Sequence, residues 1–163
     1  DKCMILIAAE CGLRSSDIIW LRFDEINWDK KLISKTQHKT GIHVNVPFTE
    51  QVQFLLLDYL KNHRPDVRLE YIFINTVTNS AFTSAKILTQ IVYKNFKKAG
   101  IERRCRKRGA HTLRHSLATT MLANNTPVPV ITGVLGHASS RTTQKYLSID
   151  VDGLRKVSLE VPE

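Results

Sequence analysis

The sequence predicts a single, mainly α-helical domain with a small antiparallel β-sheet, an α+β fold. Apolar residues recur at helical spacing along most of the chain, whereas residues 31–48 contain two strand-like runs around a glycine-containing turn. No internal repeat and no Gly/Ser-rich linker divides the 163 residues, so we expect one domain over 1–163. The composition, 42% apolar and 24% charged, is that of a globular protein and argues against disorder.

Helices are expected at the start of the chain and after the strand-like stretch. Residues 2–11 predict a buried helix that Gly12 ends, because glycine adopts the left-handed C-terminal conformation without strain. Ser15 or Ser16 is expected to cap a short second helix. A third amphipathic segment, 49–64, begins with the capping pair Thr-Glu and ends before a proline.

Strands are expected over 31–37 and 42–48, joined by a turn in which Gly41 supplies a permissive backbone. Residues 71–75 predict a further short strand, and residues 84–99 another amphipathic helix. The last third of the chain predicts helices over 112–124, 128–135, 140–147 and 150–158.

The charge balance indicates a polyanionic partner. There are 24 Lys and Arg residues against 15 Asp and Glu residues, a formal charge of +9. Clustered cations bind nucleic acid because they release its condensed counterions. One segment with a single acid, Glu102, concentrates the charge, and we expect it to bind DNA through Lys97, Lys98, Arg103, Arg104, Arg106, Lys107 and Arg108.

Cysteine usage and hydropathy exclude several classes. Cys3, Cys11 and Cys105 are odd in number and widely spaced, which argues against a disulfide framework and against a zinc site. No stretch approaches the roughly 18 apolar residues of a membrane span. We therefore expect a protein of a reducing compartment with no membrane partner, and Asp1, inside an apolar run, to be a boundary of the fragment.

Two features near the C-terminal end contain side chains of the types that bind phosphate or catalyse reactions. His111 and Arg114 lie three residues apart at a helix start and share one face, which suits a phosphate cradle, although spacing alone favours a solvated polar face. His111 and His115 have H-x-x-x-H spacing, but position 112 is Thr, so no metal is expected. Tyr146 is either half-buried packing or a nucleophile among cations.

Five short motifs follow one another along the chain: Gly12-Leu13-Arg14-Ser15-Ser16-Asp17, Lys39-Thr40-Gly41, His111-Thr112-Leu113-Arg114-His115, Leu135-Gly136-His137 and Tyr146. In this order they resemble the catalytic domain of the tyrosine recombinases, also called phage-type integrases. The resemblance runs from about Asp1 to Tyr146. It implies the DNA breaking-rejoining catalytic fold of that family.

The resemblance also implies roles for the cations. Arg14 and Arg114 would clamp the non-bridging oxygens of the scissile phosphate, a task that suits forked guanidinium groups. Lys39, at the hairpin tip, would be the general acid for the leaving 5′-oxygen. Lys35 lies in the same hairpin, so this assignment depends on the Lys-Thr-Gly tip.

For the remaining site residues the resemblance implies a nucleophile and its helpers. Tyr146 would attack phosphorus, His111 would be its acid/base partner, and His137 would donate a hydrogen bond to the phosphate. Asp17 would orient the first arginine without touching DNA. His115 is expected to have a structural role.

The implied function is site-specific DNA recombination or integration through a 3′-phosphotyrosyl intermediate, without a cofactor or metal. The expected partners are double-stranded DNA and three further copies, in a homo-tetramer on two DNA sites. The expected location is the cytoplasm, at the nucleoid, in a bacterium, phage or mobile element.

Family members usually carry an N-terminal DNA-binding domain, which we do not find in this chain. Residues 147–163 are expected to form a tail that packs on its own domain or on a neighbour.

Two other functions fit the same residues. A type IB-like topoisomerase uses a comparable set of side chains but relaxes supercoils instead of exchanging strands. A non-catalytic DNA-binding module would use the basic segment and the helices to hold the DNA backbone. Covalent attachment to DNA through Tyr146 separates the enzymes from the binding module.

Overall fold

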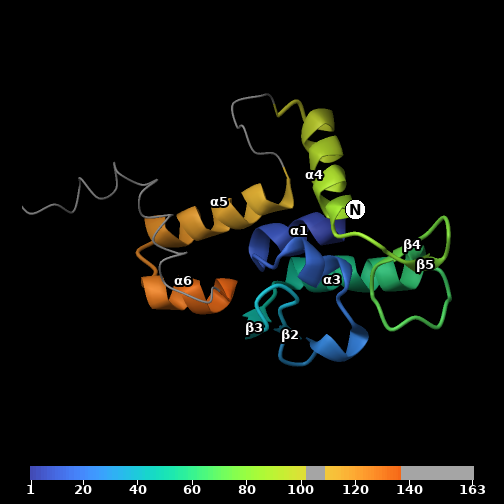
Figure 1. The fold of residues 1–163 in the computed structure, drawn as a ribbon, viewed down its shortest axis with the longest axis horizontal. Helices are drawn as coiled ribbons and strands as arrows, with labels where there is room; N and C mark the ends of the chain where they lie inside the picture. Colours follow the sequence, from blue (N-terminus) through green and yellow to red (C-terminus); the bar gives the residue numbers. More distant parts are fainter. Residues whose placement is uncertain (102–108, 137–163) are drawn as a thin grey trace, which may run out of the picture.

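The computed structural model describes residues 1–101 and 109–136 (Figure 1). The expected α+β class is confirmed. The elements are α1 (Lys2–Glu10), α2 (Ser15–Ile19), η1 (Phe23–Glu25), β1 (Ile26–Asn27), β2 (Leu32–Thr36), β3 (His43–Pro47), α3 (Glu50–Asp58), the π-helix η2 (Tyr59–His63), β4 (Ile74–Asn75), β5 (Ser80–Ala81), α4 (Lys86–Lys98), α5 (Ala110–Ala123) and α6 (Val128–Leu135).

Helix α1 is the centre of the core. It contacts α2, α3, α4 and α5, and Figure 1 shows it between α5 and α3. Its residues Ile7 and Ala8 are fully buried. As predicted, the helix ends before Gly12, whose φ of +61° is left-handed. The chain therefore turns sharply into the segment that carries Arg14.

Strands β1, β2 and β3 form an antiparallel sheet in that order. The predicted hairpin is confirmed, with Ile33 opposite Val46 and Lys35 opposite Val44. Alternate residues of both strands are buried, so one face of the hairpin packs on the protein. The turn requires Gly41, because its φ is +67°.

Three expectations about element boundaries are wrong. Helix α2 is capped by Arg14 instead of Ser15 or Ser16, because the extended Arg14 backbone lets its carbonyl accept the first helical bond, from Ile18 N. The strand expected over 71–75 reduces to β4, because Tyr71 instead bridges to Arg22. Helix α5 begins two residues earlier than expected, at Ala110, because Gly109 provides its extended N-cap.

The other predicted helices agree with the structure. The Thr49 hydroxyl caps α3 by accepting from Val52 N, and the helical segment runs on through η2 to His63. Helix α6 has the predicted bounds. The helices expected over 140–147 and 150–158 lie outside the described residues. No helix in the described ranges is long and apolar enough to cross a membrane.

Candidate active site

The structure brings Arg14 and Arg114 together at the C-terminal end of α6. Arg114, on α5, is 2% exposed. Its Nη1 donates to the carbonyl of Gly12, 102 positions away, at 2.6 Å, and its Nη2 donates to the carbonyl of Leu135 at 2.5 Å. Arg14, half-buried at the start of α2, donates from Nη2 to the carbonyl of Gly136 at 3.2 Å. Two neighbouring carbonyls thus hold the two guanidinium groups.

Gly136 makes this close approach possible. It is the C-cap of α6 and has a left-handed φ of +58°. A Cβ atom at this position would lie 2.5 Å from the side-chain nitrogen of Gln37. Only glycine combines this backbone conformation with the space available. The next residue, His137, lies outside the described residues, as does Tyr146.

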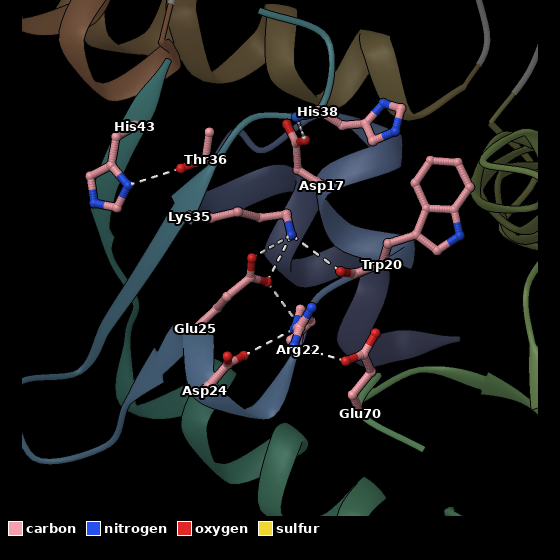
Figure 2. A network of polar contacts seen from close by, with 10 residues as sticks. All are labelled: Asp17, Trp20, Arg22, Asp24, Glu25, Lys35, Thr36, His38, His43 and Glu70. Atoms are coloured by element: carbon pink, nitrogen blue, oxygen red, sulfur yellow. Dashed lines mark hydrogen bonds and ion pairs between the residues drawn. The ribbon is translucent and has the colours of Figure 1, made fainter. Parts of the chain in front are cut away.

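Lys39 lies at the exposed tip of the β2–β3 hairpin, as predicted. The turn that carries it is held by Asp17, whose Oδ1 accepts from the amide of His38 at 2.9 Å. Figure 2 shows this carboxylate directed at the hairpin. Asp17 is fully buried, and among the described residues its Oδ2 has no hydrogen-bond partner.

The contact of Asp17 differs from the one that the resemblance implied. The carboxylate was expected to orient the guanidinium of Arg14, but the hydrogen bond that the structure gives it is to the hairpin. Arg14 Nη1 instead donates to the side-chain oxygen of Gln37. The carboxylate is short and lies in α2, so it reaches the main chain of the adjacent turn.

The second lysine of the hairpin, Lys35, is engaged elsewhere. Its side chain is 7% exposed, and its Nζ lies 2.7 and 2.9 Å from the two carboxylate oxygens of Glu25 and 3.1 Å from the carbonyl of Trp20 (Figure 2). An ammonium group has three donors, and these acceptors occupy them. Lys39, by contrast, is exposed at the hairpin tip.

His111 lies in the first turn of α5 and is exposed. Its Nε2 is 2.6 Å from Nε2 of His115, one helical turn later, and the two rings meet edge to face. At this distance one ring nitrogen donates a hydrogen bond and the other accepts it. Spacing alone predicted the shared helix face but not this contact.

Sequence reasoning missed Gln37. This residue is fully buried, its Nε2 donates to the carbonyl of Leu135 at 3.0 Å, and its Oε1 accepts from Thr40 Oγ1 at 2.9 Å. The signal was its position: Gln37 continues the inward-facing series of β2 after Ile33 and Lys35. A polar residue on the buried face of a strand needs specific partners.

The basic segment is described only in part. Lys97 and Lys98 are exposed at the C-terminal end of α4. The other expected DNA-binding residues, Arg103, Arg104, Arg106, Lys107 and Arg108, lie outside the described residues. Within residues 1–101 and 109–136, no group of three or more His, Cys, Asp and Glu side chains is arranged to hold a metal ion.

Comparison with known proteins identifies the family. The profile of the phage integrase family matches residues 1–152. The putative integrase/recombinases y4rF and y4gC of Sinorhizobium fredii (strain NBRC 101917 / NGR234) are each 32% identical over 99% of this chain, which covers 38% of y4rF and 83% of y4gC. The tyrosine recombinase XerA of Pyrococcus furiosus is 30% identical over 96% of this chain, which covers 52% of that relative.

A solved structure shows the same fold. The XerH site-specific recombinase, bound to palindromic difH substrate in a post-cleavage complex, superposes with a TM-score of 0.79 at 26% identity, over 96% of this chain and 44% of XerH. The chain thus spans about half or less of the length of y4rF, XerA and XerH. Profile, relatives and fold agree, and the chain belongs to the phage integrase family.

Proposed function

We propose that this chain is the catalytic domain of a site-specific DNA recombinase or integrase that cuts and rejoins strands through a 3′-phosphotyrosyl intermediate. The observation that supports this most is the meeting of Arg14 and Arg114 at Leu135 and Gly136. Residues from α2, α5 and α6 converge there, one position before His137. Family membership supports the same conclusion.

The two arginines suit the clamping of a phosphate. Each guanidinium is a planar fork of donors that matches two oxygens of a phosphodiester. The carbonyls of Gly12 and Leu135 set the plane of Arg114 before any ligand binds. Such preorganised donors stabilise charge that develops in the transition state, and they need no rearrangement during the reaction.

In the proposed reaction, the Tyr146 oxygen attacks phosphorus and gives its proton to His111. The bond between phosphorus and the 5′-oxygen breaks, and Lys39 gives a proton to that oxygen. The products are a 3′-phosphotyrosyl ester and a free 5′-hydroxyl. The 5′-hydroxyl of a partner strand then attacks the phosphotyrosine, so one phosphoester replaces another and no energy source is consumed. His137 would donate a hydrogen bond to the phosphate, and no metal takes part.

The proposal extends to the assembly. Strand exchange between two duplexes needs several active sites, and we infer a homo-tetramer on two DNA sites, with residues 147–163 packing on their own domain or on a neighbour. The relative XerH is bound to a DNA substrate, which supports double-stranded DNA as the partner. The enzyme would act at the nucleoid, on chromosomal or mobile-element DNA.

Trapping of the covalent intermediate tests the proposal. The chain is incubated with a pool of nicked duplexes of randomised sequence that includes the DNA flanking its gene. The nick lets the short strand with the new 5′-hydroxyl diffuse away, so a denaturant-resistant protein–DNA adduct is expected to accumulate. Tyr146→Phe should abolish the adduct, whereas the control Tyr93→Phe, at an exposed position of α4, should retain it.

Two outcomes would overturn the proposal. DNA binding without any adduct would favour a non-catalytic binding module. Adduct formation accompanied by efficient relaxation of any supercoiled plasmid, without strand exchange, would favour a type IB-like topoisomerase.

A further inference from the structure

The Gln37 side chain joins three parts of the candidate site. Its Oε1 accepts from Arg14 Nη1 and from Thr40 Oγ1, next to Lys39, while its Nε2 donates to the carbonyl of Leu135. The main chain of Gln37 closes the hairpin turn, because its carbonyl accepts from Gly41 N and its amide donates to the carbonyl of Ile42. One fully buried residue therefore contacts the first arginine, the lysine-bearing turn and the end of α6.

The chemistry of this position calls for an amide. Two donors approach the side-chain oxygen, and a carbonyl faces the side-chain nitrogen, so the position needs an acceptor with two lone pairs beside a donor. A carboxylate would place an oxygen against the carbonyl of Leu135. A thioether of similar length would leave the half-buried Arg14 and Thr40 donors and the carbonyl of Leu135 without this partner, which is costly for groups shielded from water.

We propose that Gln37 is a positioning residue for the DNA-cleavage reaction: it sets the guanidinium of Arg14 and the turn carrying Lys39 against the end of α6. The inference rests on the proposed function. Gln37 does not touch DNA in this scheme. It acts on Arg14 and Lys39, the two cations that contact DNA in the proposed function. The Gln37 amide is neutral, so it orients the Arg14 guanidinium without cancelling the positive charge of that group.

Substitution of Gln37 tests this in single-turnover cleavage of a nicked duplex recovered from the pool. Gln37→Met is expected to slow adduct formation by about 10- to 100-fold, the usual effect of losing a group that orients a reacting one. Binding of the same duplex should change little. Gln37→Glu, which keeps the acceptor for Arg14 but not the donor for Leu135, should also slow cleavage. The matched control Gln53→Met, on α3, should cleave like the wild type, and thermal unfolding of each variant checks its fold.

A double-mutant cycle separates positioning from general damage. Because Gln37 acts through Arg14 as well as through the turn carrying Lys39, Gln37→Met should slow the Arg14→Ala variant by a clearly smaller factor than it slows the wild type, since one of the two groups it positions is already gone. A loss of equal factor in both backgrounds would overturn the inference, as would wild-type cleavage by Gln37→Met. A wild-type chain that forms no adduct would overturn the proposed function together with this inference, whereas adduct formation unaffected by Gln37→Met overturns the inference alone.

Discussion

Two polar clusters lie along the β2–β3 hairpin, and they hold their cations differently. In the first, Lys35 donates to the carboxylate of Glu25, and Arg22 pairs with Asp24 and Glu70 (Figure 2). In the second, Arg14 and Arg114 donate to main-chain carbonyls and to the amide of Gln37. The two clusters approach each other at Lys35, in β2, and Gln37, just after it.

The difference separates a structural role from a chemical one. A carboxylate neutralises the cation that it binds, and the pair then contributes to the fold. A carbonyl or an amide fixes the direction of a guanidinium while leaving its positive charge to act on a ligand. The first cluster therefore ties strand β2 to η1, whereas the neutral acceptors of the second orient guanidinium groups, as the proposed phosphate clamp requires.

The largest expected effect contrasts the two lysines of the hairpin. Lys39→Met should slow cleavage by about 10²- to 10⁴-fold, the usual contribution of a general acid, and should leave stability unchanged because the residue is exposed. Single-turnover cleavage and thermal unfolding measure the two effects. A duplex with sulfur in place of the bridging 5′-oxygen should restore the rate, because a thiolate leaves without a proton. An unchanged rate with the oxygen substrate would remove Lys39 from the chemistry.

Arg114→Ala tests the clamp. It should reduce cleavage by about 10²- to 10³-fold, as expected for the loss of a preorganised donor to the transition state. DNA binding, measured by titration with the same duplex, should fall far less, since one cation among many contributes to binding. Arg22→Ala, in the carboxylate-bound cluster, is the control and should leave cleavage intact. Equal losses of cleavage and binding for Arg114→Ala would contradict the clamp role.

Lys35→Met should have the opposite profile to Lys39→Met. It leaves the carboxylate of Glu25 without its ammonium partner, and the cost in unfolding free energy should be below the roughly 3–5 kcal/mol of a fully buried pair, because Glu25 keeps 19% exposure and still accepts from the Arg22 amide. Denaturant unfolding gives this loss, and cleavage by the folded fraction should persist. A variant that is as stable as the wild type but does not cleave would reverse the roles assigned to the two lysines.

Gly136→Ala tests how tightly the second cluster is packed around Gln37. A left-handed backbone costs a non-glycine residue roughly 1–2 kcal/mol, and the new Cβ would also collide with Gln37. Gly100→Ala is the matched control, because its φ of +66° is similar but nothing lies within 4 Å of its added Cβ. Chemical unfolding should show a greater loss for Gly136→Ala, and its cleavage should slow as well. Equal losses of stability at both positions would show that the packing around Gln37 is loose.

Much of the fold could be predicted from local patterns. Gly12 ends α1, Gly41 lies in the hairpin turn and Thr49 caps α3, because each signal depends on the backbone or on a neighbour within three residues. The length of the strand expected over 71–75 was overestimated, because it depends on a contact between residues distant in the sequence. The partner of Tyr71 is Arg22, far away in the sequence, and no local pattern reports it.

The sequence by itself determined the α+β class, the hairpin and the order of the motifs, because periodicity, capping and turn chemistry are local and the motifs resemble those of the family. Only the tertiary structure decided which hairpin lysine is engaged by a carboxylate, that Asp17 holds the turn, and that Gln37 joins Arg14 to the end of α6. These contacts join residues from different helices and strands. The direction of a buried polar side chain depends on which donors and acceptors the packing brings within about 3 Å, a distance that sequence spacing does not contain.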